Sequence, residues 1–202
     1  NLEEYKHENN HCQKKTYAPY GEKILIHISN FRKVKRVEDV LRVFDKVRKK
    51  IPSKLILMGD GPERHNIERI CRELDTCDDI RSLGKVVSPE KILPIGDLFL
   101  LPSETESFGL AALEAMASKV PVISTNTGGL PEVNKHGYSG FMSNVGEVND
   151  MAKNALYILE DDTRLNQFKE NAYLQAKKFD ISLILPMYER LYESLVKIPS
   201  AI

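Results

Sequence analysis

The sequence predicts an α/β protein whose core is an open parallel sheet flanked by helices, with a helical tail at the C-terminus. Short, almost continuously apolar runs such as Ile24–Ser29 and Leu55–Met58 are typical of parallel strands that are buried on both faces. They alternate with segments such as Val37–Val47, whose apolar residues recur at helical spacing. Strand–helix alternation with short connections indicates right-handed βαβ units.

Each expected element follows from these two periodicities. In chain order they are a strand at Ile24–Ser29, a helix at Val37–Val47, a strand at Leu55–Met58, a helix at Ile67–Leu74, a strand at Ile80–Leu83, a short helix from Pro89, a strand at Asp97–Leu101, a helix of small residues at Phe108–Ser118 and a strand at Val120–Ser124. This order is Rossmann-like.

Beyond Gly140–Met142 the pattern becomes helical, over Val148–Leu159, Thr163–Phe179 and Ser182–Val196. Pro186 should kink the last of these helices or mark its first turn. We therefore expect a linker or end segment over residues 1–20, a Rossmann-like domain over 21–180 and a C-terminal helix over 181–202.

Composition excludes several classes of function. The 202 residues suffice for one domain, and 29 basic residues balance 29 acidic ones, so no global field attracts nucleic acid or an anionic membrane. No apolar run approaches the ~20 residues of a membrane span. Cys12, Cys71 and Cys77 cannot all pair and form no CxxC, which favours free thiols in a reducing cytosol. The spacing of His65, Cys71 and Cys77 fits no common zinc pattern, so we expect no metal.

Ligands of open α/β sheets bind beyond the carboxyl ends of the strands, here the loops at 29–36, 59–63, 84–87, 102–110 and 125–132. The loop at 59–64 does not match the dinucleotide fingerprint, because Arg64 stands where the third glycine belongs and Pro62 removes an amide. No P-loop and no GxSxG elbow is present.

Two carboxylates eight residues apart form the clearest constellation. Glu106 precedes the small-residue helix, and Glu114 would lie about 9 Å along it if the helix starts at Phe108. Gly109 would let a ligand approach the helix start, where free amides favour phosphate. The alternatives are a solvated helix face for Glu114 and a glycine that serves only packing.

A basic loop follows the first strand. Arg32, Lys33, Lys35 and Arg36 place four cations within five positions, the densest basic patch of the chain. At the carboxyl end of a strand these cations suit a phosphate, and Arg can bind one bidentately. The alternative is a solvated charged face.

The ordered set of motifs resembles the donor-binding half of the retaining GT-B glycosyltransferases of family four. Glu106-Ser-Phe-Gly-Leu with Glu114-Ala-Met-Ala is similar to that family's donor-site signature. The segments at 29–36, 59–62, 97–103, 121–125 and 128–132 follow in the family's order, so the resemblance covers about residues 24–160.

The resemblance implies the donor-binding half of a two-domain cytoplasmic enzyme, free or peripheral at the inner face of the membrane. It would move a hexose or N-acetylhexosamine from a UDP-sugar to a hydroxyl acceptor, without a cofactor. The last helix would cross back to an N-terminal GT-B domain that is missing from this chain, and the fragment alone would be inactive.

The family's roles carry over to numbered positions. Glu106 would meet the donor sugar, Glu114 the ribose hydroxyls, and the backbone near Lys85 the base. The implied catalytic residues are Glu106, Arg32 and Arg36, and the implied donor-binding residues are Ser29, Asn30, Lys35, Gly59, Lys85, Ser107, Phe108, Gly109, Leu110 and Glu114. Because Asn30-Phe31 replaces the family's usual Gly-Arg, the choice among Arg32, Lys35 and Arg36 for the diphosphate stays open.

Three other functions remain open at this point. A glycosidase also uses two carboxylates, although it needs no basic loop. An epimerase of GT-B type would isomerise a UDP-sugar, and a non-catalytic module would only bind the nucleotide.

Overall fold

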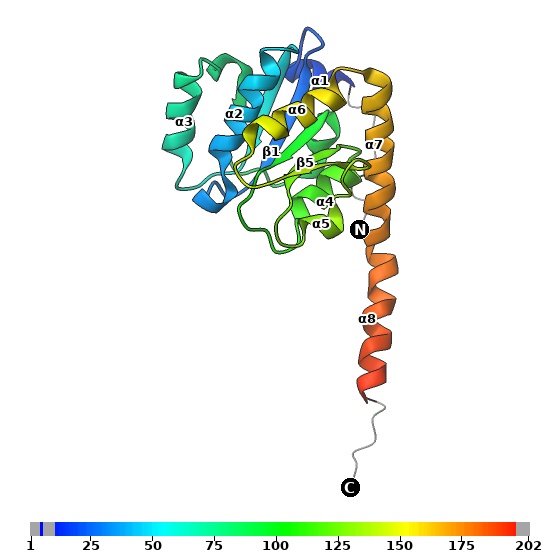
Figure 1. The fold of residues 1–202 in the computed structure, drawn as a ribbon. Helices are drawn as coiled ribbons and strands as arrows, with labels where there is room; N and C mark the ends of the chain where they lie inside the picture. The colour runs from blue at the N-terminus through cyan, green and yellow to red at the C-terminus, as the bar shows by residue number, and fades with distance from the viewer. Residues whose placement is uncertain (1–4, 6–10, 197–202) are drawn as a thin grey trace.

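A six-stranded, all-parallel sheet forms the centre of the molecule (Figure 1). The computed structural model describes Tyr5 and residues 11–196. The strands lie in the order β3-β2-β1-β4-β5-β6. Their bounds are β1 Lys23–Ile28, β2 Ser53–Met58, β3 Ile80–Ser82, β4 Leu98–Leu101, β5 Val122–Thr125 and β6 Gly140–Ser143. The parallel-sheet prediction is confirmed, and β6 is a strand that the sequence analysis did not foresee.

Helices cover both faces of the sheet (Figure 1). One apolar core joins the sheet to α2, α3 and α6, and a second joins it to α4, α5 and the end of α7. The helices are α1 His11–Tyr17, α2 Val37–Arg48, α3 Arg64–Glu73, α4 Leu110–Ala117, α5 Leu130–Val133, α6 Val148–Leu159, α7 Asp162–Ala176 and α8 Ile181–Val196. Single 3₁₀ turns connect them at Lys33–Lys35, Cys77–Asp79, Pro89–Lys91, Leu93–Ile95 and Lys177–Phe179.

The strand order reverses between β1 and β4. β1 pairs with β2 along its whole length, from Lys23 to Ile28, but with β4 only through Leu25↔Leu98 and Ile26↔Phe99. The loops after β1 and β4 therefore leave the sheet at the point where the strand order reverses. Open α/β sheets bind ligands at such a switch point.

Part of the segment expected to be a linker packs on the domain. Residues 1–4 and 6–10 lie outside the described residues, whereas α1 is followed by Ala18, which is buried. Lys14 Nζ donates to both oxygens of the Asp97 carboxylate, at 2.8 and 2.7 Å, and Lys169 Nζ donates to one at 2.8 Å. Burial alone would raise the pKa of Asp97, but Lys169 and Lys14 hold it below its usual value.

The prediction that all three cysteines are free thiols is wrong. Cys71, at the end of α3, forms a disulfide bond with Cys77, and their Cα atoms are 5.2 Å apart. Cys12 is free and exposed. The turn after α3 brings the chain back on itself, which the six-residue spacing does not reveal.

The last helix extends away from the body of the molecule beyond α7 (Figure 1). α8 continues through Pro186, and large apolar side chains such as Leu185, Tyr188 and Leu191 are about half exposed. No helix within the described part of the chain has the length and apolar character that crossing a bilayer requires.

Candidate functional site

The basic loop after β1 packs closely against the loop after β2. The Phe31 side chain is buried, and its backbone is left-handed, with φ of 38°. A Cβ atom on Gly59 would lie 1.8 Å from the Ser29 carbonyl oxygen, and one on Gly61 would lie 2.1 Å from that of Asn30. Both positions therefore require glycine, and the two loops touch along their backbones.

One cation of the basic loop contacts the first of the paired carboxylates. Lys35 Nζ lies 2.6 Å from Glu106 Oε2, and the two side chains are only 21% and 16% exposed. The Glu104 amide donates to the Val34 carbonyl at 2.8 Å, which joins the same two loops. The switch point thus brings together the basic loop and Glu106, as the topology predicts.

The two arginines of the loop lie elsewhere. Arg36, with φ of 48°, precedes α2, and its Nε donates to Asp39 Oδ2 at 2.6 Å. That hydrogen bond raises the pKa of Arg36 above its usual value. Arg32 is exposed and forms no ion pair within the described part of the chain. Of the three cations left open by the sequence, Lys35 is the one beside Glu106.

The turn that carries Glu106 is held by the loop after β5. The Gly129 amide donates to the Glu106 carbonyl at 3.2 Å, and a Cβ atom on Gly128 would lie 1.7 Å from that same oxygen. Gly109, with φ of 90°, precedes the first residue of α4. Phe108 packs edge to face on Phe179, with ring centroids 5.8 Å apart.

Glu114 lies closer to the start of its helix than the sequence suggests. α4 begins at Leu110 rather than at Phe108, so Glu114 is about 6 Å along the axis. Its side chain is half-buried, which raises the pKa of its carboxyl group, as does the nearby Glu90. A hydrogen bond from Tyr5 acts in the opposite direction. The alternative of a fully solvated face is not what the structure shows.

A cavity of about 300 Å³ opens beside the basic loop. It brings together four residues that the sequence analysis assigned to donor binding. They are Ser29, Asn30, Gly59 and Lys85, and the lining is completed by Ile28, Met58, Asp60, Val86 and Pro89.

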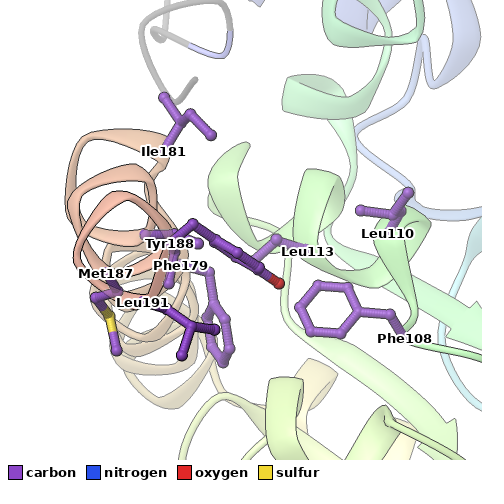
Figure 2. Close-up of a pocket in the computed structure, with 9 residues that line it drawn as sticks. Phe108, Leu110, Leu113, Phe179, Ile181, Met187, Tyr188 and Leu191 are labelled. Atoms are coloured by element: carbon purple, nitrogen blue, oxygen red, sulfur yellow. The ribbon is translucent and has the colours of Figure 1, made fainter. Parts of the chain in front are cut away.

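A larger groove of about 820 Å³ lies between α4 and α8 (Figure 2). Phe108 and Leu113 point toward Phe179, Tyr188 and Leu191 across it (Figure 2). Leu110 lines the same groove and is 64% exposed, and Ser107 on the adjacent turn is exposed. Its side chains are apolar apart from the Tyr188 hydroxyl, whereas Ser29, Asn30, Asp60 and Lys85 are among the residues that line the small cavity.

One residue of the site was not singled out from the sequence. His27, on β1, is completely buried; its Nδ1 lies 2.8 Å from the Leu100 carbonyl oxygen and its Nε2 2.8 Å from Ser29 Oγ. Burial lowers the pKa of His27 to about 4, so the ring is neutral at physiological pH. The only signal in the sequence is a histidine inside a strand that is otherwise apolar.

The described residues contain no group of three or more His, Cys, Asp or Glu side chains placed to hold a metal ion. The site consists of the largely buried Lys35–Glu106 pair, the start of α4 after Gly109, the half-buried carboxylate of Glu114 and the 300 Å³ cavity. Together they suit a phosphorylated ligand that also carries hydroxyl groups.

This chain belongs to the family described as glycosyl transferases group 1, which matches residues 10–175. It is 43% identical over 178 residues to N-acetyl-alpha-D-glucosaminyl L-malate synthase of Bacillus anthracis, covering 88% of this chain and 47% of that protein. It is 33% identical over 144 residues to 2-deoxystreptamine N-acetyl-D-glucosaminyltransferase of Niallia circulans, covering 69% of this chain and 36% of that protein. The chain spans about half or less of the length of these relatives.

Solved structures show the same fold. Anabaena HepE, crystallised with UDP and glucose, superposes with a TM-score of 0.87 at 20% identity, over 98% of this chain and 55% of HepE. S. aureus TarM, in a complex that includes UDP, superposes with a TM-score of 0.78 at 26% identity, over 85% of this chain and 35% of TarM. The fold is that of one half of a GT-B glycosyltransferase.

Proposed function

We propose that this chain is the donor-binding half of a retaining glycosyltransferase, which moves a hexose or an N-acetylhexosamine from a UDP-sugar to a hydroxyl acceptor. The observation that carries the proposal is the Lys35–Glu106 pair at the switch point, on the loop that leads to the start of α4. The names of the B. anthracis and N. circulans relatives support the sugar class, and the UDP complexes of HepE and TarM support the nucleotide.

The ligand would lie across the site in three parts. The nucleoside would occupy the 300 Å³ cavity, with its ribose hydroxyls toward Glu114, while Lys35, Arg32 and the amides at 108–110 hold the diphosphate. Glu106 would then meet the sugar. Arg36 would have to leave Asp39 to reach the diphosphate, so Lys35 and Arg32 are the better placed cations.

The reaction would break the bond between the anomeric carbon and the phosphate oxygen, and the leaving UDP would keep the electron pair. The acceptor oxygen would form its new bond on the same face, and its proton would pass to the departing phosphate oxygen, which gives retention. The protein's part is to stabilise the charge that builds up on the diphosphate. Each charge-assisted hydrogen bond that strengthens in the transition state contributes about 1.5–3 kcal/mol.

Calorimetric titration of this chain with UDP, ADP and GDP tests the binding step. We expect Lys35→Met to weaken UDP binding by at least about tenfold, because it removes a charge-assisted contact. Lys33→Met is the matched control, since Lys33 is an exposed cation two positions away. Equal losses in the two variants would show that only general charge matters.

Turnover tests the catalytic step and requires the chain joined to its N-terminal half. We expect Glu106→Ala and Lys35→Ala each to lower turnover by at least ~10²-fold, because both residues meet at the switch point. Unchanged turnover in both would end the assignment. Isomerisation of the UDP-sugar without an acceptor would indicate an epimerase. Nucleotide binding without any turnover would indicate a binding module. Release of sugar from an unactivated glycoside would indicate a glycosidase.

A further inference from the structure

His27 occupies the point at which β1 and β4 separate. The last paired residues of these strands are Ile26 and Phe99, so His27 and Leu100 are the next residues along each strand. The Leu100 carbonyl accepts a hydrogen bond from the His27 ring. The rings of Phe31 and Phe99 lie roughly parallel to the imidazole, with centroids 6.3 and 6.5 Å from it.

The hydrogen bonds determine which ring nitrogen carries the proton. A backbone carbonyl only accepts, so Nδ1 of His27 must donate to Leu100. In the neutral ring Nε2 is then a bare acceptor, and the Ser29 hydroxyl must donate its only hydrogen to it. One lone pair of Ser29 Oγ accepts the Phe31 amide at 3.3 Å, which leaves one lone pair.

We propose that His27 is a positioning residue that fixes the Ser29 hydroxyl as a hydrogen-bond acceptor toward the 300 Å³ cavity, so that Ser29 binds an O–H or N–H group of the nucleoside and not a phosphate oxygen. The inference rests on the proposed function, because the ligand is taken to be a UDP-sugar. Ser29 lines the cavity, and its hydroxyl group donates its hydrogen to the fully buried ring of His27.

The environment of His27 keeps this arrangement stable. Among charged groups, Lys35 disfavours protonation of the ring and Glu106 favours it, but burial is the dominant effect on its pKa. A protonated Nε2 would donate to Ser29 and free the hydroxyl hydrogen to turn outward. The neutral ring therefore determines the polarity that Ser29 offers to a ligand.

Binding measurements on this chain with UDP test the inference, with inorganic pyrophosphate as the second probe, measured by displacement of UDP. We expect Ser29→Ala to weaken UDP binding by about 3- to 10-fold, the loss of one neutral hydrogen bond, and to leave pyrophosphate binding unchanged. Ser53→Ala is the control, because Ser53 is the first residue of β2 and lies at the amino-terminal end of the strands, opposite to the end that carries Ser29. It should change neither affinity.

The double mutant distinguishes positioning from packing. His27→Asn can keep an N–H toward Leu100 while it releases Ser29, so we expect a similar loss of UDP affinity and no further loss in the Ser29→Ala background. Nitrogen NMR of the unaltered chain should show His27 protonated on Nδ1 and neutral from pH 8 to 5.5. Additive losses, an equal loss of pyrophosphate affinity, or a proton on Nε2 would overturn the inference. Absence of UDP binding by the unaltered chain would instead overturn the proposed function.

Discussion

Gly128 offers a direct test of the idea that the loop after β5 positions Glu106. A methyl group at this position would meet backbone atoms only, 1.7 Å from the Glu106 carbonyl oxygen and 2.8 Å from its carbonyl carbon. Backbone cannot rotate out of the way as a side chain can. In Gly128→Ala the two backbone segments must therefore separate by about 1.7 Å to reach an ordinary contact distance of 3.4 Å.

Gly137 provides the matched control. Its φ of +73° is close to the +56° of Gly128, so alanine meets the same left-handed strain of roughly 1–2 kcal/mol at both sites. No heavy atom lies within 4 Å of a Cβ atom on Gly137. The difference between the two variants therefore isolates the contact with Glu106, for which overpacking adds about 1–3 kcal/mol.

Thermal unfolding and UDP titration measure the two consequences. For a chain of this length each kcal/mol shifts Tm by about 2–4 °C, so Gly137→Ala should lower Tm by about 2–8 °C and leave UDP affinity unchanged. Gly128→Ala should lower Tm further, and turnover of the joined protein should fall about 10²-fold, the effect of a 1 Å misplacement. If the two variants match in Tm and in turnover, the loop after β5 does not position Glu106.

Three further predictions concern charge. Asp97→Asn should lower the free energy of unfolding by about 3 kcal/mol in urea, because it leaves Lys14 and Lys169 facing an uncharged buried partner, with UDP binding unaffected. As pH falls from 6.5 to about 4, His27 gains a proton in the unfolded chain but not in the folded chain, so the free energy of unfolding should fall. The decrease should be about 3 kcal/mol larger than in His27→Phe, as measured by urea unfolding at pH 6.5 and at pH 4. Glu114→Gln should raise Tm at neutral pH, because burial opposes the charged carboxylate, yet weaken UDP binding by about tenfold in calorimetry; a lower Tm with unchanged affinity would contradict this.

Periodicity was enough to predict the central strands, because β1 and β2 are buried on both faces and read as continuous apolar runs. It did not predict β6, which is short, only partly buried and begins with glycine. A Cβ atom on Gly140 would lie 1.9 Å from the Val122 carbonyl oxygen, so glycine is required by the neighbouring strand and not by a turn. In the sequence, a glycine that is required by a neighbouring strand cannot be distinguished from a glycine in a loop.

The sequence predicts which loops form the candidate site, but it does not predict the contacts within it. Which loops meet follows from the strand order, whereas the partner of each cation depends on local backbone geometry. The 3₁₀ turn at Lys33–Lys35 and the left-handed backbone of Arg36 direct Lys35 toward Glu106 and Arg36 toward Asp39. Glycine in a sequence can indicate a left-handed backbone, but an arginine with that backbone conformation has no comparable signature.

A small rotation at the turn between α7 and α8 would move the far end of the exposed helix α8 by several ångströms. α8 is about 24 Å long, so a rotation of ten degrees at the turn Lys177–Phe179 displaces its far end by about 4 Å. Phe179, inside this turn, rests against Phe108 in the turn before α4. A body that binds the far end of α8 would therefore be connected, through Phe179 and Phe108, to the turn that precedes α4.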